Sequence, residues 1–209
     1  LAAVGDRLTC VVTFRNHPTS VLSPNFRPAY LTTLEDRLQL IENSGVGLVV
    51  PVTFDPELSR LQASEFAGLL SDRLRMRRLV IGPDFAMGHK REGDSDRLTA
   101  IGDEQGFSVE VAEPLRDETG RVIGSTAVRE ALGKGDVTRV SSLLGRNHTV
   151  SGTVVKGVGR GGPLGFPTAN LELPPGIAMP GDGIYATHAV VDGRRLMAAT
   201  SIGTRPTFG

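Results

Sequence analysis

The first two thirds of the chain alternate short apolar runs with segments of helical period. Four runs have the length of a β-strand and are apolar at nearly every position, which is typical of strands buried on both faces of a parallel sheet. They span residues 8–14, 47–52, 79–82 and 107–111. Strand and helix alternating in this order predict a doubly wound α/β fold for this part of the chain.

Two segments between these runs carry clear helical signals. Residues 33–45 place apolar side chains on one face of a helix, and Gly45 is a typical residue beyond a helix end. Thr32 and Glu35 have the spacing of a capping box, so we expect this helix to begin just after Thr32. Residues 64–74 repeat the pattern and begin on a serine, which predicts a second helix from that serine onward.

The pattern changes after about residue 145. Short alternating segments separated by Gly and Pro replace the helical period, at residues 148–156, 168–173, 184–191 and 195–201. Asp192-Gly193 is a favoured two-residue turn and predicts a β-hairpin between the last two segments. We therefore expect an α/β domain over residues 1–145 and an antiparallel sheet or small β-barrel over residues 146–209.

Composition and charge narrow the functional class. The 209 residues are 39% apolar and 22% charged, as in ordinary folded proteins, and no stretch approaches the roughly 18 apolar residues of a membrane span. With 23 basic and 23 acidic residues the formal net charge is zero, so we expect no nucleic-acid or membrane partner. The single cysteine, Cys10, excludes an internal disulfide, and the four histidines lack metal-ligand spacing. These features predict a cytoplasmic protein.

A glycine-rich segment at residues 152–170 is the strongest local signal. It carries six glycines and Arg160 between two predicted strands, so that backbone N–H groups can approach a phosphate and the arginine adds positive charge. Thr168 and Asn170 are two apart on a predicted strand and would point the same way. A hydroxyl and an amide oxygen on one face can help to hold a magnesium ion that also binds ATP phosphates. An ordinary glycine-rich connection is the alternative interpretation.

Two further places have the chemistry of a binding site. Ser125 or Thr126 would cap a helix that carries Arg129 one turn in, which predicts an anion site, although a plain helix cap explains the same residues. Residues 14–18 and 82–89 follow the first and third predicted strands, at the sheet edge where open α/β folds bind ligands. Three phenylalanines near this edge could enclose a flat ring or belong to the core; they are Phe14, Phe54 and Phe85.

Together these segments resemble the bacterial bifunctional riboflavin kinase/FMN adenylyltransferase family, also called FAD synthetase. The resemblance runs in order along the whole chain, through residues 11–18, 31–37, 61–66, 81–88, 125–129, 143–146, 164–170 and 202–209. The string Gly-Phe-Pro-Thr-Ala-Asn at residues 165–170 is its most specific part.

The resemblance implies two reactions. A C-terminal barrel would phosphorylate riboflavin with Mg-ATP to give FMN, and an N-terminal nucleotidyltransferase-like α/β domain would transfer AMP from ATP to FMN, giving FAD and pyrophosphate. By the same resemblance, the residues that bind ATP in the kinase are Gly157, Gly159, Arg160, Gly161, Gly162, Gly165, Thr168 and Asn170, and the last two also bind Mg²⁺. The resemblance also implies that the catalytic residues that would neutralise the triphosphate during adenylyl transfer are Ser125, Thr126 and Arg129. The flavin-binding residues that the resemblance implies are Phe14, His17, Pro18, Phe54, Asp84 and Phe85.

The chain also departs from the family pattern. The family's His-x-Gly-His motif would stand before Leu1, and its kinase glutamate would follow Gly209. We therefore expect a fragment that lacks the first strand, contains an incomplete barrel and is inactive alone. Asn16 stands where the family usually has proline. Two other functions remain open: a non-catalytic flavin- or nucleotide-binding module, and an adenylyltransferase for another phosphorylated acceptor.

Overall fold

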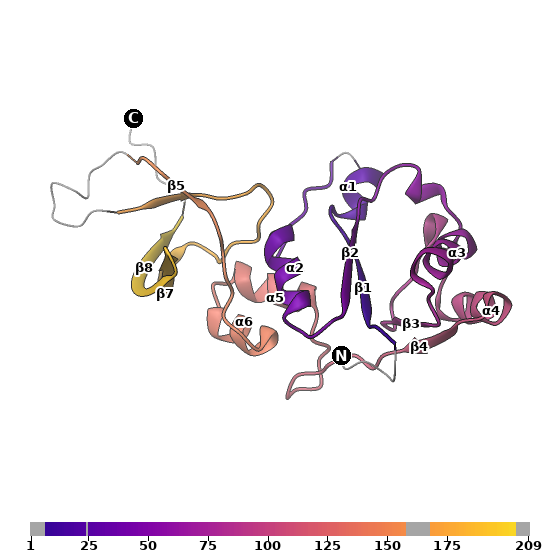
Figure 1. Ribbon diagram of the computed structural model, residues 1–209. Helices are drawn as coiled ribbons and strands as arrows, with labels where there is room; N and C mark the ends of the chain where they lie inside the picture. The colour runs from indigo at the N-terminus through magenta and orange to yellow at the C-terminus, as the bar shows by residue number, and fades with distance from the viewer. Residues whose placement is uncertain (1–6, 24, 158–167, 204–209) are drawn as a thin grey trace. The chain divides into compact units, whose positions relative to one another are not determined.

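The structure is a computed structural model that describes residues 7–23, 25–157 and 168–203 (Figure 1). The chain divides into two compact units. The first consists of Leu1–Phe26 and Ile41–Val122, and the second consists of Arg27–Leu40 and Ile123–Gly209. The second unit thus includes a segment from the N-terminal part of the chain.

The first unit contains two pairs of parallel strands. β1 (Cys10–Phe14) pairs with β2 (Leu48–Val52), and β3 (Arg78–Ile81) pairs with β4 (Ser108–Val111). All four strands predicted for the first part of the chain are present, and their parallel pairing is confirmed. Among the described residues the two pairs form separate two-stranded sheets.

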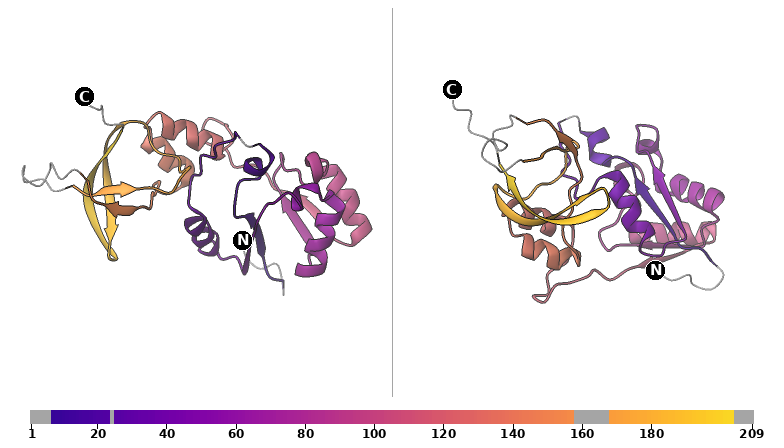
Figure 2. Two further views of the ribbon diagram at one scale, coloured as in Figure 1. Left: turned by 90° about the horizontal axis from the view of Figure 1, so that it is seen from above. Right: turned by 60° about the vertical axis from the view of Figure 1, so that its left-hand side comes forward.

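Helices cover one face of the β3–β4 pair. α3 (Ala63–Leu74) and α4 (Ser95–Gln105) lie on the same side of this pair, as Figure 1 and the left view of Figure 2 show. The core of this part contains Ala63, Ala67, Ile81, Met87, Leu98, Ile101 and Phe107. The prediction that such strands are buried on both faces is wrong for β3, because its residues alternate and Val80 is 53% exposed on the uncovered face.

The start of α3 differs from the sequence prediction. The helix begins at Ala63, one residue earlier than the serine expected to start it. Gln62 is the N-cap, and its N–H donates a hydrogen bond of 2.7 Å to the Glu65 carboxylate within a complete capping box. A glutamine is an unusual cap, which is why the more typical serine drew the prediction.

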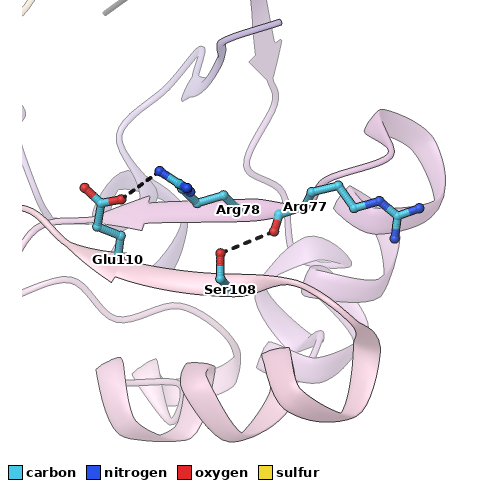
Figure 3. A network of polar contacts seen from close by, with 4 residues as sticks. All are labelled: Arg77, Arg78, Ser108 and Glu110. Carbon is cyan, nitrogen blue, oxygen red and sulfur yellow. Dashed lines mark hydrogen bonds and ion pairs between the residues drawn. The ribbon is translucent and has the colours of Figure 1, made fainter. Parts of the chain in front are cut away.

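Polar contacts add to the pairing of β3 and β4. Figure 3 shows Arg78 and Glu110 approaching across the two strands, with Nη1 and Oε2 3.2 Å apart. Ser108 Oγ donates to the carbonyl oxygen of Arg77 at 3.4 Å. Because both side chains of the ion pair are about half exposed, we expect the pair to contribute less than about 1 kcal/mol to stability.

The second unit combines helices with antiparallel strands. α5 (Ser125–Gly133) and α6 (Val137–Leu144) share a core of Val128, Ala131, Leu132, Val140 and Leu143. β5 (Thr153–Val155) pairs with β6 (Asn170–Glu172), and β7 (Gly183–Val191) pairs with β8 (Arg194–Ile202). The antiparallel character predicted here is confirmed, although the hydrogen-bonded pairs of the described residues do not close into a barrel.

The predicted hairpin forms as expected. Asp192 and Gly193 connect β7 to β8 with φ values of +48° and +74°, the left-handed pair that a type I′ turn requires. Figure 2 shows the two strands as one long curved ribbon. Both positions suit residues that tolerate positive φ, so the local sequence alone determines this turn.

α2 (Leu34–Glu42) has a different cap from the one predicted. Thr33 Oγ1, and not Thr32, accepts the hydrogen bond from the Asp36 N–H, at 3.0 Å. Gly45 adopts a φ of +81°, and its N–H donates to the carbonyl oxygen of Glu42 at 3.0 Å. None of the helices in the described ranges is long and apolar enough to cross a membrane.

Candidate functional site

Two of the predicted flavin-binding residues meet at the carboxyl ends of β1 and β2. Phe14 is the last residue of β1, and Phe54 follows the end of β2 by two positions. Their ring centroids are 5.3 Å apart and their planes meet at 77°, which is an edge-to-face contact. The contact lies at the kind of sheet edge where α/β folds bind ligands.

Asn16 links the two loops that carry these rings. Its Oδ1 accepts a hydrogen bond of 2.9 Å from the Phe54 N–H, and its Nδ2 donates one of 2.8 Å to the Phe54 carbonyl oxygen. The sequence drew attention to Asn16 only as a departure from a family pattern. Its partner lies 38 positions away, so no local signal indicated the contact.

His17 and Pro18 begin the short helix α1 (Pro18–Leu22). His17 is the N-cap, its Nδ1 accepts from the Thr19 N–H at 3.2 Å, and its carbonyl oxygen accepts from Ser20 Oγ at 2.6 Å. An accepting Nδ1 places the proton of the neutral ring on Nε2. The imidazole also lies against the ring of Phe26, with centroids 4.7 Å apart. These contacts fix the orientation of the imidazole.

Asp84 and Phe85 lie in the loop after β3. Arg91 Nη2 donates to the Asp84 carbonyl oxygen at 2.9 Å, and the Phe85 N–H donates to the Gly82 carbonyl oxygen at 3.1 Å. Phe85 is 40% exposed and its ring makes no ring contact within the described part of the chain. Of the three aromatic residues expected to enclose a flat ring, the structure therefore brings two into contact.

The same loop is fastened to the start of α3. The Glu92 carboxylate accepts a hydrogen bond from the Ala63 N–H, and the His89 N–H donates to the Leu61 carbonyl oxygen at 2.7 Å. Gly88 has a φ of +83°, and a Cβ at this position would lie 2.5 Å from the Ala63 nitrogen. Sequence reasoning missed Glu92, because its partner is 29 positions away.

The predicted anion site at α5 has a different cap. Gly124 is the N-cap and supplies no side-chain hydrogen bond, so the prediction that Ser125 or Thr126 caps the helix is wrong. Both residues lie inside the first turn. Because glycine brings no side-chain acceptor, the N–H groups of this turn remain available for an anion, to which the helix dipole adds attraction.

Arg129 lies one turn beyond these residues. Its Nε donates a hydrogen bond of 2.7 Å to the carbonyl oxygen of Ala29, a residue 100 positions earlier in the same unit. This bond fixes the base of the guanidinium, while the two terminal nitrogens keep donor capacity for a second acceptor. The arrangement suits recognition of a phosphate or carboxylate.

Part of the predicted ATP-binding loop falls within the described residues. Asn170 is the first residue of β6 and pairs with Val155 of β5, while Thr168 precedes the strand and is exposed. The prediction that Thr168 and Asn170 share a strand is therefore wrong at its first residue. The Asn170 amide lies against Gly157, where a Cβ would overlap it. The remaining predicted loop residues lie outside the described part of the chain: Gly159, Arg160, Gly161, Gly162 and Gly165.

A cavity of about 560 Å³ lies within the second unit, between α2 and the segment that leads into β5. Its polar lining includes Glu35, Asp36 and Gln39 of α2, together with Ser151 and Thr153. None of the predicted site residues lines it.

His148 is the clearest perturbed titratable group in the second unit. Its Nε2 lies 3.3 Å from the Ala178 carbonyl oxygen, and its buried Nδ1 has no hydrogen-bond partner. Burial lowers the pKa of His148, with a smaller contribution from the Arg146 charge, although the bond to Ala178 acts in the opposite direction. The neutral imidazole is therefore the form that this environment favours.

Comparison with known families identifies the chain. The family model described as FAD synthetase matches residues 1–127, which is more than half of the chain. The chain belongs to the FAD synthetase family. A second model, described as riboflavin kinase, matches residues 144–209 of this FAD synthetase family chain. The resemblance inferred from the sequence motifs is confirmed.

Individual curated relatives support the membership of this chain in the FAD synthetase family. The bifunctional riboflavin kinase/FMN adenylyltransferase of Escherichia coli (strain K12) is 38% identical over 199 residues, which cover 94% of this chain and 63% of the relative. The proteins of the same name from Listeria monocytogenes and Bacillus subtilis are 34% and 33% identical, and the matches cover 96% and 95% of this chain and 63% and 62% of those proteins. The chain thus spans less than two thirds of the length of these curated relatives.

A solved structure has a similar fold. The crystal structure of a macrolide-efflux protein from Streptococcus pneumoniae superposes with a TM-score of 0.84 at 29% identity. The match covers 95% of the FAD synthetase family chain and 64% of that protein.

Proposed function

We propose that this chain contributes residues to two ATP-dependent sites of FAD biosynthesis: an FMN adenylyltransferase site in residues 1–145 and a riboflavin kinase site in residues 146–209. The observation that carries the proposal is that FAD synthetase and riboflavin kinase family models match two successive, non-overlapping segments of one chain. We also propose that the parallel strands belong to a doubly wound sheet, that the antiparallel strands belong to a barrel, and that the protein works in the cytoplasm without a nucleic-acid or membrane partner.

In the transferase, a phosphate oxygen of FMN would attack the α-phosphorus of ATP, and pyrophosphate would leave. The triphosphate would bind the first turn of α5 through Ser125 and Thr126, with Arg129 compensating its charge. The Nε bond from Arg129 to the Ala29 carbonyl supports this role, because it orients the guanidinium without occupying its terminal nitrogens. The flavin would bind near Phe14, His17, Pro18, Phe54, Asp84 and Phe85.

In the kinase, a hydroxyl oxygen of riboflavin would attack the γ-phosphorus of ATP, giving FMN and releasing ADP and the hydroxyl proton. Thr168 and Asn170 would hold a magnesium ion, which would neutralise charge on the ATP phosphates. The Asn170–Gly157 packing supports this assignment, since the absent Cβ leaves room for the amide. No group of three or more His, Cys, Asp and Glu side chains in the described ranges is placed to hold a metal. The ATP-binding loop would comprise Gly157, Gly159, Arg160, Gly161, Gly162 and Gly165.

A two-step assay tests the proposal. The chain, and separately the product of the complete reading frame that encodes it, are incubated with Mg-ATP and riboflavin or FMN. FMN, FAD and pyrophosphate are then separated and quantified. We expect FMN from riboflavin and FAD plus pyrophosphate from FMN with the complete product. Binding of flavin or ATP without turnover would favour a non-catalytic module, and AMP transfer to another phosphorylated acceptor but not to FMN would favour a different adenylyltransferase.

A further inference from the structure

The side chain of Asn16 continues the β1–β2 ladder beyond the last paired residues of the two strands. The final residue pair of the ladder is Phe14 with Val52, and the Arg15 N–H adds one more bond, of 2.8 Å, to the Val52 carbonyl oxygen. In a continued parallel ladder, the Phe54 N–H would donate to the carbonyl oxygen of residue 15, and the Phe54 carbonyl oxygen would accept from the N–H of residue 17. Asn16 makes these bonds with its side-chain amide instead, by accepting from the Phe54 N–H and donating to the Phe54 carbonyl.

Because the Asn16 side chain makes the hydrogen bonds to Phe54, the main chain beyond residue 15 does not have to make them and can turn. Immediately after Asn16 the chain forms the N-cap of α1 at His17, so its backbone cannot remain extended along β2. A primary amide carries one acceptor oxygen and two donor hydrogens on one short side chain, and it can pair with the N–H and C=O of a single residue as a peptide group does. Asn16 therefore holds the loop after β2 in register while the loop after β1 starts a helix.

The hydrogen bonds of Asn16 also affect the position of the Phe54 ring relative to Phe14. The Phe54 backbone is fastened on both its donor and its acceptor, and the Phe54 side chain meets Phe14 at 5.3 Å between centroids. We propose that Asn16 is a positioning residue for the flavin: it fixes Phe54 against Phe14, and the pair presents a preorganised aromatic corner to the isoalloxazine ring. This inference rests on the proposed adenylyltransferase function.

The sharpest test replaces the amide by a carboxylate of the same shape. In Asn16→Asp an ionised side chain still accepts from the Phe54 N–H, but its second oxygen faces the Phe54 carbonyl and repels it. Asn16→Ala removes both bonds without adding charge and serves if the aspartate variant does not fold. Asn147→Asp is the matched control, because Asn147 is exposed and the bond that its side chain makes with the described residues is accepted from Ser141 Oγ at 3.1 Å, which a carboxylate can accept equally.

Two measurements are made on each variant in the complete reading-frame product. Hydrogen exchange of the Phe54 amide reports whether the bond to residue 16 holds, and flavin fluorescence and calorimetry report the Kd values for FMN and ATP. We expect faster exchange at Phe54, FMN affinity weakened by about tenfold and ATP affinity unchanged in Asn16→Asp, with no change in the control.

Each other outcome overturns a specific statement. Faster exchange at Phe54 with unchanged FMN affinity would mean that Asn16 is merely structural. Equal losses of FMN and ATP affinity would mean that the variant disturbs the protein generally, and this result would also contradict a specific positioning role for Asn16. A wild-type protein that forms no FAD and binds no FMN would overturn the proposed function itself, and the inference would fall with it, whatever the exchange data show about the hydrogen bond.

Discussion

The side-chain amide of Asn170 occupies the space next to Gly157 that the Cβ of any other residue would fill. Val155 and Asn170 are paired across β5 and β6, so Gly157 follows the pairing by two positions and lies beside the start of β6. The first glycine of the predicted ATP-binding loop is thus next to one of the two predicted magnesium ligands.

Gly157→Ala should displace that amide. The added methyl group overlaps Asn170, so the side chain or the local backbone has to move, and we expect formation of FMN from riboflavin to fall by about tenfold or more. Unfolding should become easier by about 1–3 kcal/mol, as measured in urea. Gly133→Ala is the matched control, because a Cβ there meets nothing within 4 Å. Equal FMN formation by both variants would contradict a role for the Gly157–Asn170 packing.

Separate substitutions should split the two proposed activities. Arg129→Ala removes the guanidinium beside the first turn of α5, and we expect FAD formation from supplied FMN to fall by about 100-fold or more while riboflavin phosphorylation continues. Thr168→Ala and Asn170→Ala should do the reverse. FMN, FAD and pyrophosphate are measured for each variant. Arg97→Ala, which removes an exposed cation from α4, is the control. Loss of both activities in one folded variant would contradict the assignment of two sites.

Local patterns predicted much of the fold. The hairpin of β7 and β8 follows from period-two alternation around Asp192-Gly193, whose turn chemistry lies within two residues. The four strands of the first part were predicted from a different local signal, because their apolar runs are continuous in sequence. Helix starts were less predictable. Gln62 and Gly124 are caps that each stand next to, or within two residues of, a serine with the more typical chemistry for a cap. For α2, Thr32 had the capping-box spacing to Glu35, but the neighbouring Thr33 accepts the hydrogen bond.

The contacts that position the candidate site were mostly beyond the reach of sequence reasoning. The Asn16–Phe54 bonds depend on the register that pairs Phe14 with Val52, and a shift of one residue would separate them. The bond from Arg129 to the Ala29 carbonyl likewise spans 100 positions and depends on residues 27–40 joining the second unit. Motif reasoning selects residue types, whereas these partners are determined by tertiary packing.

The loop after β3 should be sensitive to substitution at Gly88. Gly88→Ala adds a Cβ 2.5 Å from the Ala63 nitrogen and also strains a backbone with a φ of +83°. We expect a loss of about 2–4 kcal/mol in the free energy of unfolding, together with weaker FMN binding if this loop carries Asp84 and Phe85 to the flavin.

Gly120→Ala helps to separate the two effects of Gly88→Ala, which are the overlap with Ala63 and the backbone strain of a positive φ. Gly120 has a similar φ of +81°, but a Cβ there meets nothing within 4 Å, so only the backbone strain of about 1 kcal/mol should remain. Urea unfolding of both variants measures the difference. If the two variants lose the same stability, the close approach of the loop to α3 does not matter for folding.

His148 should make stability depend on pH. Burial lowers the pKa of His148 in the folded protein, so the unfolded chain binds the proton more readily. Stability from this group is therefore complete above the unfolded value of about 6.5 and is lost as the pH falls through that value toward the lower folded pKa. The physical cause is the buried Nδ1, which has no acceptor for a second ring proton.

We expect His148→Gln, which cannot titrate in this range, to flatten the slope of unfolding free energy against pH between about 5 and 7. His188→Gln is the control, because His188 lies on the exposed side of β7. An unchanged slope in His148→Gln and a flattened one in His188→Gln would assign the pH dependence to the hairpin instead.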